Sequence, residues 1–512
     1  MTRRYLTTPI YYASGEPHLG HAYTTVLTDV LARYYRQTGA DVLFLTGTDE
    51  HGQKMQEVAA KRGVPPGQLA NQMAESFRAT WKTLDISFDR FIRTTETEHV
   101  GVVKTILERL WAKGQIYDDV YRGWYCVHEE RYWTDKDVGP NHLCPDCQRS
   151  VSYVEEKNYF FRMSDYQARL VHYIEDNPRW IIPETRRNEV LGFLKQPLQD
   201  LSISRPKSRL NWGITLPFDD EHVCYVWVDA LINYVTGSGM LDPGAGADQP
   251  SFTDSGESWW PADLHVIGKD IITAHAVYWP TLLMAADLPL PRQILAHGWW
   301  MIDQEKMSKS TDNVVDPLAL RDDYGTDAVR WYLLREMPTG SDAVYTPERF
   351  QARYEEIANV FGNLASRTIS MICKYRDGVI PAAEGSGLHD TIDTAVQAVA
   401  RHLNDLGVHD ALAVSMDLAR SANAYVDNRE PWSQAKDPAL AADLDETLVT
   451  LIRTLTVLTA LFFPVTPEKM TELSKRLGLD SVPTVEEATF IQLTGRRVES
   501  GPPLFPKPHQ VA

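Results

Sequence analysis

The first fifty residues contain the pattern that most restricts the possible folds: a strand, a helix and a second strand in quick succession. Residues 5–12 are rich in aromatic and β-branched side chains and predict a buried strand. Apolar side chains then recur every four residues from Ala22 to Tyr34, which predicts a helix with one buried face, and Gly39 is placed to end it. Residues 41–47 predict the second strand. Two strands joined by a helix favour a parallel, doubly wound sheet, whose ligands bind at the carboxyl ends of the strands.

The strand pattern resumes after a long interruption and then gives way to helices. Residues 225–228, 264–268 and 294–296 predict further strands, and residues 237–256, rich in Gly, Ser, Asp and Pro, predict a surface loop. From Pro347 onward almost every segment has helical period, which predicts a bundle.

We therefore predict an α/β fold, a Rossmann-like doubly wound parallel sheet with a connective insertion, followed by an α-helical bundle. The predicted boundaries are 1–116 for the first half of the sheet domain, 117–209 for an aromatic, turn-rich insertion poor in helical period, 210–346 for the second half, 347–480 for the bundle and 481–512 for a tail that packs on the body.

Composition limits the number of domains, the kinds of partner and the location of the protein. At roughly 100–200 residues per domain, 512 residues predict three or four domains. The net charge of −18 argues against broad nonspecific binding of nucleic acid but allows a local basic face. The longest apolar stretch, residues 448–463, contains Arg453 and four threonines, so no membrane span is expected. Five cysteines and a start without a signal region predict a cytoplasmic protein.

Two short motifs combine residue types that bind phosphate. His18-Leu19-Gly20-His21 stands at the start of the first predicted helix, where unpaired N–H groups and the helix dipole attract anions. Residues 306–310, Lys-Met-Ser-Lys-Ser, offer two cations and two hydroxyls on a loop. Alone, the first motif is more often a pair of ordinary histidines and the second a solvated charged loop. Their joint occurrence favours a polyphosphate site.

In this order the two motifs resemble those of class I aminoacyl-tRNA synthetases, and the sequence around them is similar to the methionyl-tRNA synthetase family. Residues 9–21 match the first family signature, and residues 46–52, 226–230, 267–270 and 306–310 follow in family order. The resemblance covers nearly the whole chain. It implies that the sheet domain is catalytic, that methionine is activated with ATP and its Mg²⁺, and that methionine is then transferred to the terminal ribose of tRNA(Met).

The resemblance also implies roles for residues around ATP. His18 and His21 are expected to contact the phosphates, and Lys309 to neutralise charge on the departing pyrophosphate. Gly268 and Asp270, just after a predicted strand, suit ribose hydroxyls. The remaining expected ATP-binding residues are Gly20, Lys306, Ser308 and Ser310.

A methionine site needs a carboxylate for the ammonium group and an apolar, polarisable wall for the sulfur. Asp49 matches the family carboxylate, although aspartate is equally common as a helix N-cap. Outside the family context, the apolar and aromatic residues of such a wall are more often plain core. The residues that match the family pocket are Ile10, Tyr12, Val226, Trp227, Ala230, Tyr234 and His275.

The predicted bundle contains a candidate anticodon site. Asn363 and Arg367 lie four residues apart, on one face of a predicted helix. Trp432 follows a proline between helices, where an exposed indole can stack on a splayed base. In the family this trio reads the anticodon; an ordinary helix pair and a core tryptophan are the alternatives.

Three cysteines fall where the family often has a zinc knuckle: Cys126, Cys144 and Cys147. Glu129 stands where a fourth cysteine is expected, next to His128, with His142 further along. Three thiolates with one such residue suit tetrahedral Zn²⁺ in a structural role, while a knuckle that has lost its metal and keeps free thiols is the alternative. Cys224 and Cys373 lie in apolar runs and are expected in the core.

Rival functions fit less well. Synthetases for Ile, Val and Leu carry a large editing insertion, and residues 117–209 are too few for one. A cysteine-specific enzyme would need thiolate-selective metal ligands near the first motif. An adenylyltransferase needs neither a helical bundle nor Trp432, and an RNA-binding paralogue without activity does not need His18 and Lys309. We expect a monomer, since no appended RNA-binding domain follows the bundle.

Overall fold

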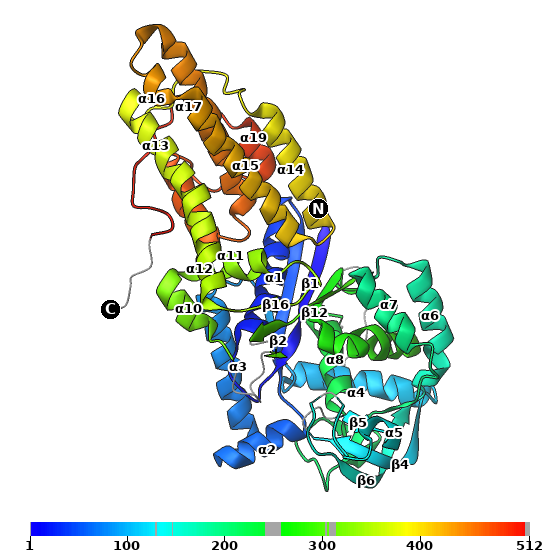
Figure 1. Cartoon of the computed structure of the whole chain (residues 1–512). Coiled ribbons are helices and arrows are strands. Elements are labelled where there is room, and N and C mark those ends of the chain that lie inside the picture. The colour runs from blue at the N-terminus through cyan, green and yellow to red at the C-terminus, as the bar shows by residue number, and fades with distance from the viewer. Residues whose placement is uncertain are drawn as a thin grey trace.

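A parallel β-sheet forms the centre of the protein (Figure 1). The computed structural model describes residues 2–127, 131–145, 147–240, 258–302, 305–306 and 314–506. Within them the sheet has six strands, in the order β3 (Arg90–Arg93), β2 (Asp41–Asp49), β1 (Arg3–Tyr12), β12 (Leu264–Gly268), β13 (Ile294–His297) and β7 (Ile181–Ile182). Every neighbouring pair is parallel, which confirms the predicted doubly wound fold and four of the predicted strands.

Helices cover both faces of this sheet because successive strand residues point to opposite sides. Leu6 and Phe44 pack with α1 and α11 in one core, whereas Tyr5 and Leu45 pack with α4, α8 and α9 in another. Gly39, with φ +83°, follows α1 as predicted. The helices of this part are α1 (Leu19–Gln37), α2 (Gln53–Arg62), α3 (Pro66–Thr83), α4 (Thr97–Ala112), α8 (Val226–Gly237), η2 (Lys269–Ile271), η3 (Ala274–Tyr278), α9 (Trp279–Ala285), α10 (Pro317–Tyr324) and α11 (Thr326–Glu336).

The strand predicted at residues 225–228 is wrong. The chain forms β11 (Asp219–Cys224) and then turns at Tyr225 into α8. A short apolar run fits either a strand or a buried helix, and here Leu231, Ile232 and Val235 extend it with helical spacing. β11 pairs with β10 (Thr215–Leu216) and β9 (Ser204–Pro206) in a small antiparallel sheet. Most of the loop predicted at 237–256 lies outside the described residues.

The insertion begins with its own antiparallel sheet (Figure 1). Its strands are β5 (Arg131–Trp133), β4 (Ile116–Cys126), β6 (Ser152–Phe161) and β8 (Leu201–Ser202), with α5 (Asp135–Val138) beside β4. Residues 117–209, described above as poor in helical period, also contain helices: η1 (Met163–Tyr166), α6 (Gln167–Asp176) and α7 (Glu184–Phe193). Helix α7 buries one side chain, Val190, so its pattern is faint, whereas α6 buries Leu170 and Ile174, four residues apart, a helical pattern that sequence reasoning missed. Between α6 and α7, β7 joins the main sheet.

A helical bundle extends away from the sheet, as predicted (Figure 1). It follows a third small sheet of β15 (Glu305–Lys306), β14 (Trp300–Ile302) and β16 (Ala343–Val344). Its helices are α12 (Pro347–Glu356), η4 (Ile357–Gly362), α13 (Asn363–Arg376), α14 (His389–Asn404), α15 (Val408–Arg429), α16 (Pro431–Gln434), η5 (Pro438–Leu440), α17 (Ala441–Phe462), α18 (Pro467–Arg476) and α19 (Val485–Phe490).

Helix α17 shows why residues 448–463 look apolar. The helix is almost wholly buried in the bundle, and Thr454, Thr456 and Thr459 each donate a hydrogen bond to the carbonyl four residues earlier. Among the helices of the described residues, none combines the length and the apolar character that a membrane span needs. In the described part of the tail, Leu504 and Phe505 are buried.

A buried ion pair joins the sheet domain to the bundle. Arg330 on α11 is 0% exposed and donates to Asp29 of α1 at 2.6 Å. The same guanidinium donates to the carbonyls of Val465 and Pro464, which follow α17. Burial alone would raise the pKa of Asp29, but Arg330, Arg33 and hydrogen bonds from Ser87 hold it below its ordinary value. The ion pair therefore fixes the helix that begins at His18 against the bundle.

We predict that Arg330→Ala lowers the free energy of unfolding by about 3–5 kcal/mol. Asp29 would lose its fully buried cation and keep Arg33 and Ser87, and the buried carbonyls of Pro464 and Val465 would lose their donor. Arg420→Ala serves as the control: Arg420 pairs with Glu356 and Asp417, its side chain is 45% exposed, and its loss should cost less than about 1 kcal/mol. Thermal unfolding of both variants measures the difference. A similar fall in Tm for both would contradict this account of the interface.

Candidate active site

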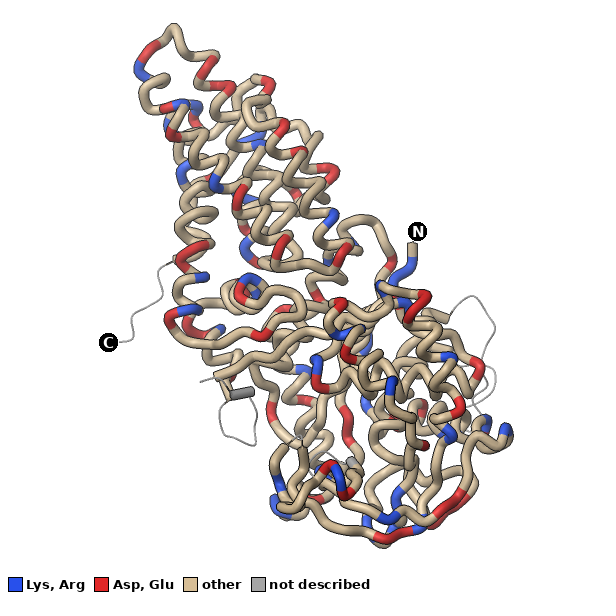
Figure 2. Tube along the Cα trace, turned by 45° about the vertical axis from the view of Figure 1, so that its right-hand side comes forward, with Lys and Arg blue, Asp and Glu red and all other residues tan. Residues whose placement is uncertain are grey.

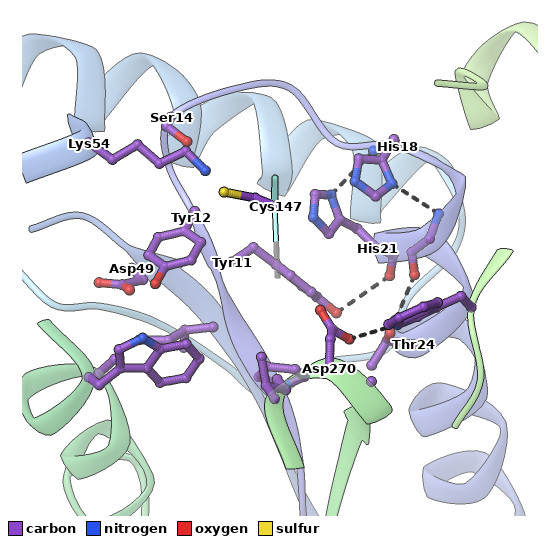
Figure 3. A pocket seen from close by; sticks show the side chains of 18 of the residues that line it. Tyr11, Tyr12, Ser14, His18, His21, Thr24, Asp49, Lys54, Cys147 and Asp270 are labelled. Carbon is purple, nitrogen blue, oxygen red and sulfur yellow. Dashed lines mark hydrogen bonds between the residues drawn. The ribbon is translucent and has the colours of Figure 1, made fainter. Parts of the chain in front are cut away.

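One cavity of about 1190 Å³ opens at the carboxyl ends of the central strands. Strands β1 and β2 end together, with Tyr12 beside Asp49, and β12 ends at Gly268 next to them. The predicted residues that line the cavity are Ile10, Tyr12, His18, Gly20, His21, Asp49, Trp227, Ala230, Tyr234, Gly268, Asp270 and His275. Figure 3 shows Asp49 and Tyr12 on one side of it and His18 and His21 on the other.

The histidine end is built by the start of α1. His18 is the N-cap, and its Nδ1 accepts from the N–H of Gly20 at 3.1 Å, while Nδ1 of His21 accepts from the N–H of His18 at 3.3 Å. The two rings stack with centroids 3.7 Å apart. A Cβ at Gly20 would lie 3.0 Å from Cε1 of His18, so glycine lets the ring fold back over the helix start. With Nδ1 accepting, each neutral imidazole carries its proton on Nε2.

The opposite end combines a buried carboxylate with an apolar wall. Asp49 is 4% exposed and ends β2; it is not a helix N-cap, because Gly52 caps α2. The rings of Tyr12 and Trp227 meet edge to face, with centroids 6.3 Å apart. This end can therefore hold a cation next to an apolar group.

A neutral histidine closes the same wall. Nδ1 of His275 donates to the carbonyl of Ile271 at 2.9 Å, so its Nε2 accepts from the Tyr234 hydroxyl at 2.7 Å. Burial lowers the pKa of His275 to about 4, despite the opposing effect of the Ile271 carbonyl and Asp270. The wall is thus uncharged at neutral pH. Val226 does not line the cavity; it is buried beneath the wall, since adjacent helical residues point about 100° apart.

Sequence reasoning missed three residues that line the cavity around the ends of β12 and β13: Thr24, His297 and Trp299. Oδ1 of Asp270 accepts from the indole N–H of Trp299 at 3.1 Å. Nε2 of His297 lies 2.7 Å from the hydroxyl of Thr24 on α1. All of these side chains line the cavity. His297 ends β13, so the rule that ligands bind at strand ends could have found it; Thr24 and Trp299 carry no such signal.

The Lys-Met-Ser-Lys-Ser loop lies mostly outside the described residues. Lys306 ends β15, whereas Ser308, Lys309 and Ser310 are not described. The chain on either side of them is next to the histidine end of the cavity. Trp300, before the loop, lines the cavity, and the carbonyl of Val315, after it, accepts from the N–H of Leu19 at 3.0 Å.

Three thiols cluster beside the cavity. The sulfur atoms of Cys126, Cys144 and Cys147 all lie within 4.8 Å of one another, and Cys126 and Cys147 also line the cavity. This spacing fits tetrahedral zinc, whose Zn–S bonds of about 2.3 Å separate sulfurs by roughly 3.8 Å. His142 is exposed and stacks on Trp124, with centroids 4.1 Å apart, and is not in the cluster.

The other two thiols, of Cys224 and Cys373, lie apart from this cluster. His128 and Glu129 lie outside the described residues. Cys224 is buried as expected, but Cys373 is only half-buried at the core edge.

The three candidate anticodon residues are on the bundle surface. On α13, Asn363 is exposed and Arg367 is half-buried, and Arg367 pairs with Asp427 at 3.0 Å. Trp432, on α16, is 41% exposed, which rules out the core alternative. Helix α16 lies at the end of the bundle far from the sheet (Figure 1).

Comparison with known proteins decides the family. The family model for class I tRNA synthetases (M) matches residues 4–155 and 147–369, and the model for the anticodon binding domain of methionyl-tRNA ligase matches residues 377–509. The chain belongs to the methionyl-tRNA synthetase family. Its place among class I aminoacyl-tRNA synthetases agrees with the parallel sheet, the histidine motif and the bundle described above.

Individual relatives are similar over almost the whole chain. The methionine–tRNA ligase of Caldanaerobacter subterraneus subsp. tengcongensis is 44% identical, with 98% of this chain and 78% of that protein covered. The methionine–tRNA ligase of Bacillus subtilis is 42% identical, with 98% and 77% covered. The solved Mycobacterium tuberculosis methionyl-tRNA synthetase in complex with methionyl-adenylate has a TM-score of 0.93 and 41% identity, covering 99% of this chain and 100% of that one.

Proposed function

We propose that the cavity joins methionine to AMP, and that the chain then transfers the methionyl group to the terminal ribose of tRNA(Met). One observation carries this proposal: a single cavity has a buried carboxylate with an aromatic wall at one end and two stacked imidazoles on a helix start at the other. The first end suits an ammonium group and a thioether, and the second suits phosphate oxygens. The mycobacterial relative, solved with methionyl-adenylate, supports the same assignment.

In the first step a methionine carboxylate oxygen attacks the α-phosphorus of ATP, and the bond from that phosphorus to the pyrophosphate oxygen breaks. This chemistry needs placement and charge stabilisation more than a protein nucleophile. We assign the ammonium group to Asp49, and the phosphate oxygens to the Nε2–H groups of His18 and His21. ATP enters as its Mg²⁺ complex, and Lys309 neutralises charge on the departing pyrophosphate.

Further contacts complete the proposed site. For methionine they are Ile10, Tyr12, Trp227, Ala230, Tyr234 and His275, with Val226 supporting the wall from beneath. For ATP they are Gly20, Gly268, Asp270, Lys306, Ser308 and Ser310. The division into domains at 116, 209, 346 and 480, the monomeric state and the cytoplasmic location stay predictions.

Exchange of labelled pyrophosphate into ATP tests the proposal. We expect methionine to drive this exchange, and Ile, Val, Leu and Cys not to. The uncharged aromatic wall suits the thioether of methionine, which the other four side chains lack. Asp49→Asn should raise the KM for methionine while leaving the KM for ATP near its original value. Another amino acid as the preferred substrate would overturn the assignment.

We propose that Asn363, Arg367 and Trp432 read the anticodon. Asn363 and Trp432 are exposed. The pairing of Arg367 with Asp427, five residues before Trp432, brings α13 close to α16, which supports this role. Lys and Arg are interspersed with Asp and Glu along the bundle rather than gathered on one side (Figure 2). In an acidic chain, recognition by stacking and a few local hydrogen bonds therefore fits better than a broad basic surface.

We predict that Trp432→Ala lowers kcat/KM for tRNA charging by roughly ten- to hundredfold, the value of one lost stack at about 1–3 kcal/mol. Pyrophosphate exchange should stay unchanged, since the indole is remote from the cavity. Phe490→Ala is a matched control, because Phe490 is another exposed aromatic residue of the bundle. An equal loss of charging and exchange in Trp432→Ala would show that the tryptophan acts on folding instead.

We also propose that Cys126, Cys144 and Cys147 hold a structural zinc ion, with a fourth ligand from His128 or Glu129. When bound, zinc would tie the end of β4 to the segment before β6 and so hold this wall of the cavity in place.

Metal analysis tests the zinc proposal. We expect one zinc per chain in freshly purified protein, no zinc in Cys144→Ser, and full zinc in the control Cys373→Ser, because Cys373 lies outside the cluster. Zinc-free wild-type protein would favour the alternative of free thiols.

A further inference from the structure

Two of the sequence segments that match the family, residues 46–52 and 226–230, are joined by a buried hydrogen bond. The first contains Asp49 and the second contains Trp227 and Ala230, all assigned above to methionine. Each also contains a buried polar residue with no assigned role, His51 and Asp229. Nδ1 of His51 lies 2.6 Å from Oδ2 of Asp229, although the residues are 178 positions apart in the chain.

A second imidazole holds the other oxygen of the same carboxylate. Nε2 of His99, on α4, lies 2.8 Å from Oδ1 of Asp229. Because a carboxylate only accepts, both imidazoles donate, His51 from Nδ1 and His99 from Nε2. The group is almost closed to solvent, with Asp229 and His99 both 0% exposed. Nδ1 of His99 reaches the Thr236 hydroxyl at 2.9 Å, so α4 contacts α8 at two points.

The carboxylate is ionised in this setting. Burial alone would raise the pKa of Asp229, but attraction to His51 and hydrogen bonds from both imidazoles lower it below its ordinary value. A buried anion has few alternative positions, since any movement away from its donors leaves a charge unpaired. The two donors therefore fix the first turn of α8 firmly.

The place of this contact links the two parts of the methionine site. Asp49 lies two residues before His51, at the end of β2. Trp227 and Ala230 flank Asp229 on α8 and line the cavity.

The end of β2 is itself held independently of α8. Both oxygens of Glu50 accept from Arg93, at 2.7 and 3.0 Å, and the Glu50 carbonyl accepts from the indole of Trp212 at 2.6 Å. The strand end is thus a rigid reference to which His51 ties the helix.

We propose that Asp229 is a positioning residue for methionine activation: by accepting from His51 and His99 together, it sets the distance between the carboxylate that binds the ammonium group and the wall that contacts the sulfur. This inference rests on the proposed function, because it takes Asp49 and Trp227 as methionine contacts. It adds that the spacing between them is held by a residue that never touches the substrate.

Methionine-dependent pyrophosphate exchange with the full chain tests the proposal. Asp229→Asn replaces one acceptor oxygen by a donor facing an imidazole. It is expected to raise the KM for methionine roughly ten- to hundredfold, the range for a lost hydrogen bond to a charged group. The KM for ATP should stay within about twofold, because Asp229 positions the methionine contacts alone. A mere loss of folded enzyme would change neither KM, so a rise in the KM for methionine cannot come from misfolding. An unchanged KM for methionine, or an equal rise in both constants, would overturn the proposal.

Matched variants of the histidines separate positioning from mere destabilisation. In His51→Asn the amide N–H replaces the donor at Nδ1, and in His99→Gln it replaces the donor at Nε2, so both should retain most of the methionine affinity. His51→Ala and His99→Ala lose the donor and should behave like Asp229→Asn. Leu418→Ala, buried in the bundle, should lower Tm without changing the KM for methionine. Equal effects of the alanine and amide variants would contradict the proposal.

The same assay distinguishes failure of the proposed methionine site from failure of the positioning role of Asp229. If the wild type shows no methionine-dependent exchange, or if Asp49→Asn leaves the KM for methionine unchanged, the proposed site is wrong and the positioning role falls with it. If Asp49→Asn raises that KM but Asp229→Asn does not, only the positioning role is wrong.

Discussion

The parallel pairing of β1 with β2 on one side and β12 on the other is the constraint on which the rest of the structure depends. It brings the ends of three strands to one edge, although β12 begins more than 250 residues after β1. The chain leaving β1 must return along the sheet as a helix, so the N-terminus of α1 opens at the same edge. The carboxylate of Asp49 and the indole of Trp227 thus meet the imidazoles although they come from distant parts of the chain.

The cavity resolves the conflict between a chain of net charge −18 and two polyanionic substrates, ATP and tRNA. Its histidine end offers N–H donors on a helix start, and the wall next to Asp49 is closed by a histidine kept neutral by burial. Each end therefore selects by local geometry rather than by net charge. The buried contacts of Asp29 with Arg330 and of Asp229 with His51 and His99 then hold the supporting helices in place.

Much of the fold and of the candidate site was predictable from the sequence because the informative patterns are local. The strand, helix and strand of residues 5–47, the histidines at the helix start and the carboxylate of Asp49 are all encoded in short segments. The apolar run at 225–228 is ambiguous, since it is a helix start, and α7 buries too little for its period to show. The period of α6, with Leu170 and Ile174 four residues apart, was readable and was missed. Contacts such as that of Asp229 with His51 depend on pairing across the whole fold, which no short window contains.

The most direct measurement of the central claim is a crystal structure of the chain with a non-hydrolysable analogue of methionyl-adenylate. The account predicts the ammonium nitrogen within hydrogen-bonding distance of Asp49, about 2.7–3.2 Å, and the phosphate analogue against Nε2 of His18 and His21. It also predicts the thioether between Trp227 and Tyr234. An analogue bound with its phosphate remote from both imidazoles, or with its sulfur outside the aromatic wall, would contradict it.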